Sequence, residues 1–304
     1  MKENEEDILR KVRKIEIKTR GLSNDIFAGK YHSAFKGRGM AFSEVRDYRI
    51  GDDIRDIDWN VTARNRKPYI KVYEEERELT MMLLVDVSAS RMFGTQGQLK
   101  KNLITEIAAV LAFSAAQNND KIGCIFFSDR IEKYIPPKKG RQHVLRIISD
   151  LVDFEPEGKG TDINGALRFF TNVMKKRCTA FLLTDFMDFS PASAGNAADD
   201  TLGVNFEEGL KIASSRHDLV GLKIYDIRES VLPNVGIIEV QDAETGRKVW
   251  VDSASAKTRE SYARYWGAAS EAIAHALTKC RVDSVAVATG EDYVAALLRL
   301  FKMR

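Results

Sequence analysis

The pattern of hydrophobic and polar positions in this 304-residue chain alternates between two types of segment. Short apolar runs with the length and bulk of strands in a buried parallel sheet occupy residues 81–85, 121–128, 178–185, 219–225 and 284–288. Segments with apolar residues three or four positions apart occupy residues 98–117, 142–151, 163–174, 206–214, 258–277 and 293–300. This alternation predicts an α/β fold with a doubly wound, mostly parallel, Rossmann-like sheet.

Two patterns depart from this alternation. Residues 131–135 predict a short antiparallel edge strand that ends at Pro136-Pro137, because proline cannot donate a hydrogen bond to a neighbouring strand. Residues 237–240 and 248–251 alternate in polarity on either side of a turn. They predict a β-hairpin, inserted in the α/β domain at about residues 228–256.

The N-terminal part of the chain follows a different pattern. Residues 3–20 have the apolar spacing of an amphipathic helix, and residues 21–40 have the composition of a loop. We therefore divide the chain into an N-terminal segment, 1–78, and an α/β domain, 79–304. Within that domain, the small and polar residues 190–203 predict a loop at the carboxyl edge of the sheet.

The composition is that of a soluble globular protein, with 44% hydrophobic and 30% charged residues. A net charge of +3 without a sustained basic run argues against a nucleic-acid partner. The N-terminus lacks the apolar core of a signal peptide, and no apolar run approaches the ~20 residues of a membrane span. The three cysteines are far apart and are expected to be reduced thiols. These features predict a cytoplasmic protein without a membrane span.

The most informative polar residues follow the first predicted strand. Asp86, Ser88 and Ser90 alternate in the loop that begins where the apolar run 81–85 ends. Open α/β sheets bind their ligands at the carboxyl ends of strands, and one carboxylate with two hydroxyls suits a hard cation such as Mg²⁺ or Mn²⁺. The alternative is a polar connecting loop in which Ser88 or Ser90 caps the next helix.

Two later residues extend this set of oxygen ligands. Thr161 precedes a predicted helix, which it could simply cap, and Asp185 ends the strand predicted at 178–185. In this order the residues resemble the metal-ion-dependent adhesion site of von Willebrand factor A-type domains. The resemblance implies a von Willebrand A-like fold. It also implies that Ser88, Ser90 and Thr161 bind the metal through their hydroxyls, while Asp86 and Asp185 act mostly through water.

A dense block of charged residues lies within the N-terminal segment, between positions 46 and 64. Its charged members include Arg46, Asp52, Asp53, Arg55, Asp58 and Arg64. Isoleucines and a tryptophan alternate with these charges, so part of the block is expected to pack and its charges to pair. The block is either a structural clasp that ties the N-terminal segment to the main domain or a binding surface beside the metal site.

This block also carries a second resemblance. Its motifs are Gly37-x-Gly39-x-x-Phe42, Arg46-x-Tyr48, Gly51-Asp52-Asp53-x-Arg55-x-Ile57-Asp58-Trp59 and Ala63-Arg64. They resemble the signature of the domain-of-unknown-function family 58, which joins it to a von Willebrand A-like domain. The resemblance continues along nearly the whole chain and implies a protein partner, a MoxR-type AAA+ ATPase or a client of it. Many members carry membrane helices before the signature, and this chain shows none there.

These observations favour a metal-dependent protein-interaction module over an enzyme. A phosphatase of the haloacid dehalogenase type is the alternative, since it also has an aspartate at a strand end. Ser88, however, stands where such an enzyme places its acid/base aspartate, and no phosphate-binding loop of the P-loop type is present. A third possibility is a scaffold that carries a vestigial metal site.

Overall fold

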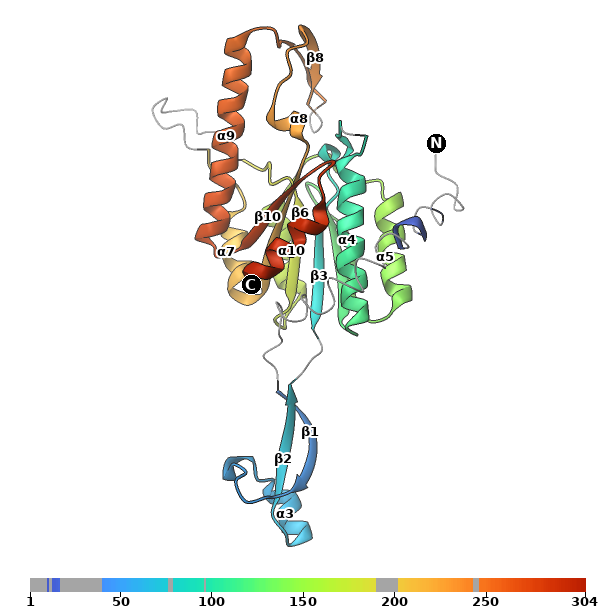
Figure 1. Cartoon of the computed structure of the whole chain (residues 1–304), viewed down its shortest axis with the longest axis vertical. Coiled ribbons are helices and arrows are strands. Elements are labelled where there is room, and N and C mark those ends of the chain that lie inside the picture. The colour runs from blue at the N-terminus through green and yellow to red at the C-terminus, as the bar shows by residue number, and fades with distance from the viewer. Residues whose placement is uncertain are drawn as a thin grey trace. The chain divides into compact units, whose positions relative to one another are not determined.

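The computed structural model describes residues 10, 13–16, 40–75, 79–95, 97–189, 202–242 and 246–304. The loops predicted at 21–40 and 190–203 lie almost entirely outside these residues. The chain divides into a small unit, Phe35–Leu79, and a large unit that contains Thr80–Arg304 (Figure 1). Of the helix predicted at 3–20, the described residues are helical, and Glu16 accepts a 2.8 Å hydrogen bond from Arg141.

The large unit is an α/β structure built on one six-stranded sheet (Figure 1). Its strands are β3 (Thr80–Asp86), β4 (Lys121–Phe127), β5 (Ile131–Lys138), β6 (Thr179–Thr184), β7 (Asp218–Tyr225) and β10 (Asp283–Ala288). They lie in the order β10-β7-β6-β3-β4-β5, and all pairings are parallel except that of β4 with β5. The sequence-based prediction of a mostly parallel α/β sheet is therefore confirmed.

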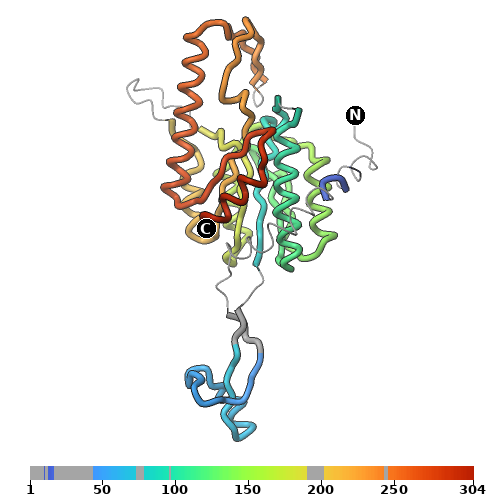
Figure 2. The backbone as a smooth tube through the Cα atoms, in the orientation of Figure 1, coloured from blue at the N-terminus to red at the C-terminus, as the bar shows by residue number. Residues whose placement is uncertain are grey.

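The strand order places β3 and β6 at the point where the chain reverses its direction of winding. Starting from β3, the chain adds β4 and β5 on one side and then returns to add β6, β7 and β10 on the other. In Figure 2 the green helical segments that follow β3 lie on one side of it, and the orange and red C-terminal segments lie on the other. Adjacent β3 and β6 are in parallel register, with Val85 opposite Leu183. Ligands of doubly wound sheets bind outside the carboxyl ends of the two strands at such a switch point. Here those ends carry Asp86 and Asp185.

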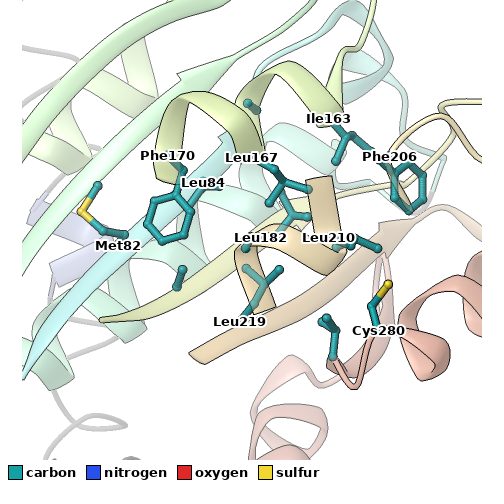
Figure 3. Packing of buried hydrophobic residues seen from close by; sticks show 14 of the residues in the cluster. Met82, Leu84, Ile163, Leu167, Phe170, Leu182, Phe206, Leu210, Leu219 and Cys280 are labelled. Carbon is teal, nitrogen blue, oxygen red and sulfur yellow. The ribbon is translucent and has the colours of Figure 1, made fainter. Parts of the chain in front are cut away.

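Helices cover both faces of this sheet. They are α4 (Lys100–Gln117), α5 (Arg141–Asp153), α6 (Ile163–Val173), α7 (Glu207–Arg216), α9 (Ala256–Lys279) and α10 (Tyr293–Met303). On one face, Leu167 and Phe170 of α6 and Leu210 of α7 pack with Leu84 and Leu182 of the central strands (Figure 3). All five side chains are fully buried, so burial of apolar surface fixes the two central strands in place.

Two irregular parts of the large unit were only partly predicted. β5 is the antiparallel edge strand expected from the sequence, but it continues through Pro136-Pro137 to Lys138. An edge strand tolerates proline because one of its sides needs no donor, and the register shifts there. The predicted hairpin is present as β8 (Ile237–Gln241) and β9 (Lys248–Asp252), and it follows the short helix α8 (Ile227–Ser230).

The small unit contains a hairpin that the sequence did not reveal. β1 (Met40–Asp47) pairs with β2 (Tyr69–Glu75) in antiparallel register, with a shift between Phe42 and Glu44. The connection holds a short 3₁₀ helix, η2 (Ile54–Asp56), and the helix α3 (Trp59–Asn65). The charged block thus forms the end of a hairpin. Its polar strands lack the apolar run by which strands of the large unit were recognised.

Across the part of the chain that the structure describes, no helix has both the length and the apolar composition needed to cross a bilayer.

Candidate functional site

The candidate site lies where β3 and β6 end side by side. Ser88 and Ser90 follow β3, and their Oγ atoms are 3.2 Å apart. Ser90 Oγ donates a 2.8 Å hydrogen bond to Asp185 Oδ2, which follows β6 and is 95 residues away in the sequence. The two serines and the second aspartate of the predicted set are therefore brought together by the parallel pairing of the two strands.

Asp86 is buried at the base of this site, and both of its carboxylate oxygens accept hydrogen bonds. Its Oδ2 accepts a 2.6 Å hydrogen bond from Thr184 Oγ1, and its Oδ1 accepts one of 2.9 Å from the backbone N–H of Ser88. The residue is only 3% exposed. Burial and the nearby charge of Asp185 raise the pKa of Asp86 to about 6, although these hydrogen bonds act in the opposite direction.

A buried lysine completes the site, and sequence reasoning missed it. Lys100 Nζ lies 3.0 Å from Asp185 Oδ2 and 2.6 Å from Glu229 Oε1, and its side chain is 2% exposed. Burial alone would lower the pKa of Lys100, but the two carboxylates outweigh it and raise the pKa. Burial likewise would raise the pKa of Asp185, yet the ammonium group of Lys100 lowers it. Lys100 is thus the counter-ion of the candidate metal ligand.

The sequence did contain a signal for Lys100. It precedes Leu103, Ile104 and Ile107 by three, four and seven positions, which is the spacing of one helix face. All three of these side chains are buried. A lysine on a buried apolar stripe requires a carboxylate partner, since an unpaired buried charge is costly.

A second buried cation, Arg91, lies in the loop after the two serines. It donates a hydrogen bond to the backbone carbonyl of Phe154 and is 5% exposed. Burial lowers the pKa of Arg91 to about 10, against the attraction of Asp86 and Glu132, so it stays cationic at neutral pH. The charges of Asp86 and Asp185 are therefore each opposed by a nearby cation.

Thr161 belongs to a loop that runs beside the serine loop. The backbone N–H of Ala89 donates a 3.1 Å hydrogen bond to the carbonyl of Lys159, two residues before Thr161. The helix-capping alternative for Thr161 is wrong, because Asp162 is the N-cap of α6 and accepts from the N–H of Gly165 at 2.8 Å. In the described chain, Ser88 precedes the 3₁₀ turn η3 (Ala89–Met92) without a side-chain capping hydrogen bond.

The spacing of the two serine hydroxyls is compatible with a small hard cation. Oxygen ligands around Mg²⁺ lie about 2.1 Å from the metal, so neighbouring ligands are about 3 Å apart. The separation of the two hydroxyl oxygens, Ser88 Oγ and Ser90 Oγ, is 3.2 Å and is close to that value. A site made of three or more His, Cys, Asp or Glu side chains is not found among the described residues. A metal here would thus depend on hydroxyl ligands.

The charged block of the small unit pairs its charges locally. Arg46 and Asp52 form two parallel hydrogen bonds of 2.8 Å. Asp53 caps η2 through the N–H of Arg55, and Asp58 caps α3 through the N–H groups of Asn60 and Val61. Arg55 and Arg64 are exposed side chains of the same unit. The clasp to the larger unit, predicted from the sequence, stays a prediction.

Several known proteins resemble this chain. The uncharacterized protein Rv1480 of Mycobacterium tuberculosis is 28% identical over 298 residues, which cover 96% of this chain and 88% of the relative. The uncharacterized protein Mb1516 of Mycobacterium bovis matches with the same values.

Solved structures resemble it less closely. The conserved hypothetical protein BatB from Bacteroides thetaiotaomicron has a TM-score of 0.46 and 15% identity, covering 74% of this chain and 98% of that one. An aerotolerance-related membrane protein from Bacteroides fragilis has a TM-score of 0.47 and 14% identity, covering 74% and 100%. The mussel byssus protein PTMP1, solved with a zinc-occupied MIDAS motif, has a TM-score of 0.35 and 17% identity, covering 49% and 38%.

The family model described as "Protein of unknown function DUF58" matches residues 44–272, which include the charged block, β3 and β6. The match spans most of the chain and agrees with the resemblance seen in the sequence motifs. This chain therefore belongs to the DUF58 family.

Proposed function

We propose that this chain is a von Willebrand A-like protein-interaction module that binds Mg²⁺ or Mn²⁺ and, through it, a carboxylate of a protein partner. Ser88, Ser90 and Thr161 would bind the metal through their hydroxyls, and Asp86 and Asp185 would hold its waters. The observation that carries the proposal is that Ser90 Oγ lies 3.2 Å from Ser88 Oγ and 2.8 Å from Asp185 Oδ2 at the switch point of the sheet.

The charge of the site favours an anionic partner. Hydroxyl ligands are neutral, and the carboxylates of Asp86 and Asp185 already face the cations of Arg91 and Lys100. A divalent cation bound here would therefore keep most of its charge and attract a further anion. The side chain of a partner's aspartate or glutamate supplies such an anion together with the hard oxygen that Mg²⁺ prefers.

The identity of the partner is a further part of the proposal. The family resemblance favours a MoxR-type AAA+ ATPase, or a client of it, in the cytoplasm. Because such an ATPase needs Mg²⁺ for its nucleotide, a chelator would disturb both proteins. Binding of a purified MoxR-type ATPase is therefore compared between wild type and Ser88→Ala at constant Mg²⁺. Equal binding by the two would contradict a metal-mediated contact.

Isothermal titration calorimetry tests the metal itself. Wild type should bind Mg²⁺ or Mn²⁺ at millimolar concentrations or below, and Ser88→Ala should lose about tenfold or more in affinity. Ser215→Ala is the matched control, because Ser215 is an exposed serine of α7 whose Oγ donates a hydrogen bond to the carbonyl of Ile212 in the same helix. Absence of binding by wild type, or equal binding by Ser88→Ala, would refute the proposal.

One observation favours the scaffold alternative. Lys100 Nζ donates a hydrogen bond to Asp185 Oδ2, the same oxygen that accepts the hydrogen bond from Ser90. The ammonium group can therefore balance the charge of this carboxylate without a metal. In that case wild type would bind no metal, whereas Lys100→Met, which frees the carboxylate, would bind Mg²⁺. The enzyme alternative predicts instead a metal-dependent hydrolysis of a generic phosphoester that disappears in Asp86→Asn.

A further inference from the structure

A large groove opens beside the candidate metal site. It has a volume of about 1010 Å³ and lies within the large unit, between the hairpin β8–β9, the first half of α9, the segment around α8 and the loop after η3. Its apolar walls include Phe93, Ile238, Val240, Val251 and Tyr265. A groove of this size accommodates several side chains of a bound segment.

Exposed apolar side chains concentrate around this groove. Among the described residues, fourteen large hydrophobic side chains are exposed, and ten of them lie on or directly beside the segments that line the groove. The ten are Met92, Phe93, Ile227, Val231, Val235, Ile237, Val240, Val249, Trp250 and Tyr265. Ile237 and Trp250 alternate with the groove-lining Ile238 and Val251, so they lie on the other face of the hairpin and only the other eight count toward the groove. Such clustering is typical of an interaction surface rather than of the scattered apolar residues on any protein surface.

The charges at the groove define which partner it fits. Three charged residues line it: Arg228, Lys257 and Glu229. Glu229 shares the buried Lys100 with Asp185, at 2.6 and 3.0 Å, so its charge is only partly balanced and one negative charge at most offsets the two positive ones. Arg228 and Lys257 are exposed, and the groove therefore presents net positive charge to a ligand.

The groove is linked to the candidate metal site by neighbouring residues and hydrogen bonds. Phe93 and Thr95 line the groove and belong to the same loop as Ser90. Thr95 is fixed by two hydrogen bonds to Asp226, one of 2.8 Å from its N–H and one of 2.6 Å from its Oγ1. Asp226 in turn caps α8, which carries Arg228. The loop that bears the serines and the wall of the groove are thus held together.

The other wall is tied to α9. Ser253, which follows β9, donates from Oγ to the carbonyl of Gly236 at 2.6 Å, and Arg259 of α9 donates to the carbonyl of Ser253 at 2.7 Å. Tyr262 donates from its hydroxyl to the carbonyl of Glu229 at 2.6 Å. The hairpin, α8 and α9 are therefore connected by hydrogen bonds, and the groove exists before a ligand binds.

We propose that this groove binds a segment of a partner protein in which apolar side chains alternate with or adjoin aspartate and glutamate residues. The apolar side chains enter the groove, and the acidic ones face Arg228 and Lys257. The inference deepens the proposed function and rests on it in one respect: the same segment would extend one carboxylate to the metal. Binding to the groove itself requires no metal.

Selection from a displayed library of random peptides against the full-length chain tests this inference. We expect enrichment of peptides rich in both apolar and acidic residues. Their affinity, measured by fluorescence polarisation, should fall about tenfold or more in Ile238→Ser, which removes a large apolar contact from the groove. The matched control is Ile237→Ser. It lies on the opposite face of the same strand, since successive strand residues alternate, and should change affinity less than about twofold.

A second pair of variants examines the charge. Lys257→Gln should lower the affinity for the selected peptides several-fold, and more strongly at low salt. Lys211→Gln, at an exposed position of α7, should leave that affinity unchanged. Three outcomes would overturn the inference. They are enrichment of predominantly basic peptides, no enrichment at all, and selected peptides that bind Ile238→Ser as tightly as wild type. A dimer of this chain that Ile238→Ser dissociates would also overturn it, because a second copy would then be the occupant.

The outcome for the groove is separable from that for the metal. Peptides that depend on Ile238 but bind Ser88→Ala as tightly as wild type, in a chain that calorimetry shows to bind no metal, would support the groove and refute the metal site. Metal binding that depends on Ser88, without any peptide that depends on Ile238, would refute the groove alone.

Discussion

Two regions of this protein that contain paired charges achieve their pairing in opposite ways. In the charged block of the small unit, Arg46 and Asp52 are six residues apart and their side chains are 36% and 19% exposed. In the candidate site, Lys100 pairs with Asp185 and Glu229, which lie 85 and 129 residues away, and it is buried. The same residue types thus form a local surface contact in one region and a long-range buried network in the other.

This difference determines what each region contributes. A surface pair is screened by water and contributes little to stability. A buried charge must keep its partner, because removing the partner leaves an unsolvated charge in the interior. The candidate site therefore depends on the fold of the whole large unit, whereas the block can adopt its structure from nearby residues. Three substitutions, taken from the largest to the smallest expected effect, test this comparison.

Lys100→Met should have the largest effect. It leaves Asp185 and Glu229 without their shared cation and should lower the free energy of unfolding by about 3–5 kcal/mol, as for other buried pairs that lose one partner. Urea denaturation at neutral pH measures the change. Lys248→Ala is the control, because Lys248 pairs with Glu239 at 2.9 Å on the exposed hairpin and should contribute about 1 kcal/mol or less.

Equal losses of unfolding free energy in Lys100→Met and Lys248→Ala would show that the burial of Lys100 does not add to stability. The contrast between a buried and a surface pair would then be wrong. A large loss in Lys100→Met alone would confirm that the candidate site is part of the stabilising core.

Asp226→Asn should have an intermediate effect that depends on pH. Burial alone would raise the pKa of Asp226, but hydrogen bonds from Thr289 and Thr95, and from the N–H of Arg228, lower it to about 2 from an ordinary 3.8. Such a depressed pKa corresponds to about 2 kcal/mol of stability above pH ~4, lost as the pH falls from there toward 2. The free energy of unfolding of wild type should therefore exceed that of the variant at pH 6, and the difference between the two should shrink below pH ~4.

Unfolding free energies from urea titrations between pH 6 and pH 3 measure this difference. A gap between wild type and Asp226→Asn that stays constant over this range would mean that the charge of Asp226 is not what stabilises α8 and the Thr95 loop.

Asp58→Ala should have the smallest effect of the three. Asp58 caps α3 with bonds of 3.0 and 3.2 Å to the N–H groups of Asn60 and Val61, and loss of such a cap costs about 1 kcal/mol. Thermal melting of the full chain measures it beside Arg55→Ala, an exposed residue of the same block expected to melt like wild type. Substantially lower melting in both variants would instead support the clasp predicted from the sequence.

Much of the fold could be predicted from the sequence because its signals are local. A run such as 81–85, apolar at every position, is typical of a strand covered on both faces, and all of its residues are buried. The small unit was not predicted at the level of strands. Its hairpin β1–β2 is rich in charged residues, and the apolar run that identifies a buried strand is missing from it.

The chemistry of the candidate site was predicted only in part, because only some of its residues are close together in the sequence. Asp86, Ser88 and Ser90 are neighbours in the sequence, so their joint position at a strand end follows from the strand itself. That Asp185 lies beside them depends on the parallel pairing of β3 with β6. The groove likewise requires that the loop with Phe93 and Thr95 lies beside a hairpin and a helix that follow it in the sequence by more than a hundred residues.

The sequence by itself determined the strands and helices of the large unit and predicted a set of candidate residues for a hard cation, since periodicity and strand ends are properties of short segments. Only the tertiary structure decided that Lys100 and Arg91 oppose the site's carboxylates and that burial raises the pKa of Asp86 to about 6. The physical reason is that charge pairing and desolvation act through space. They are set by which distant segments the packed core brings together.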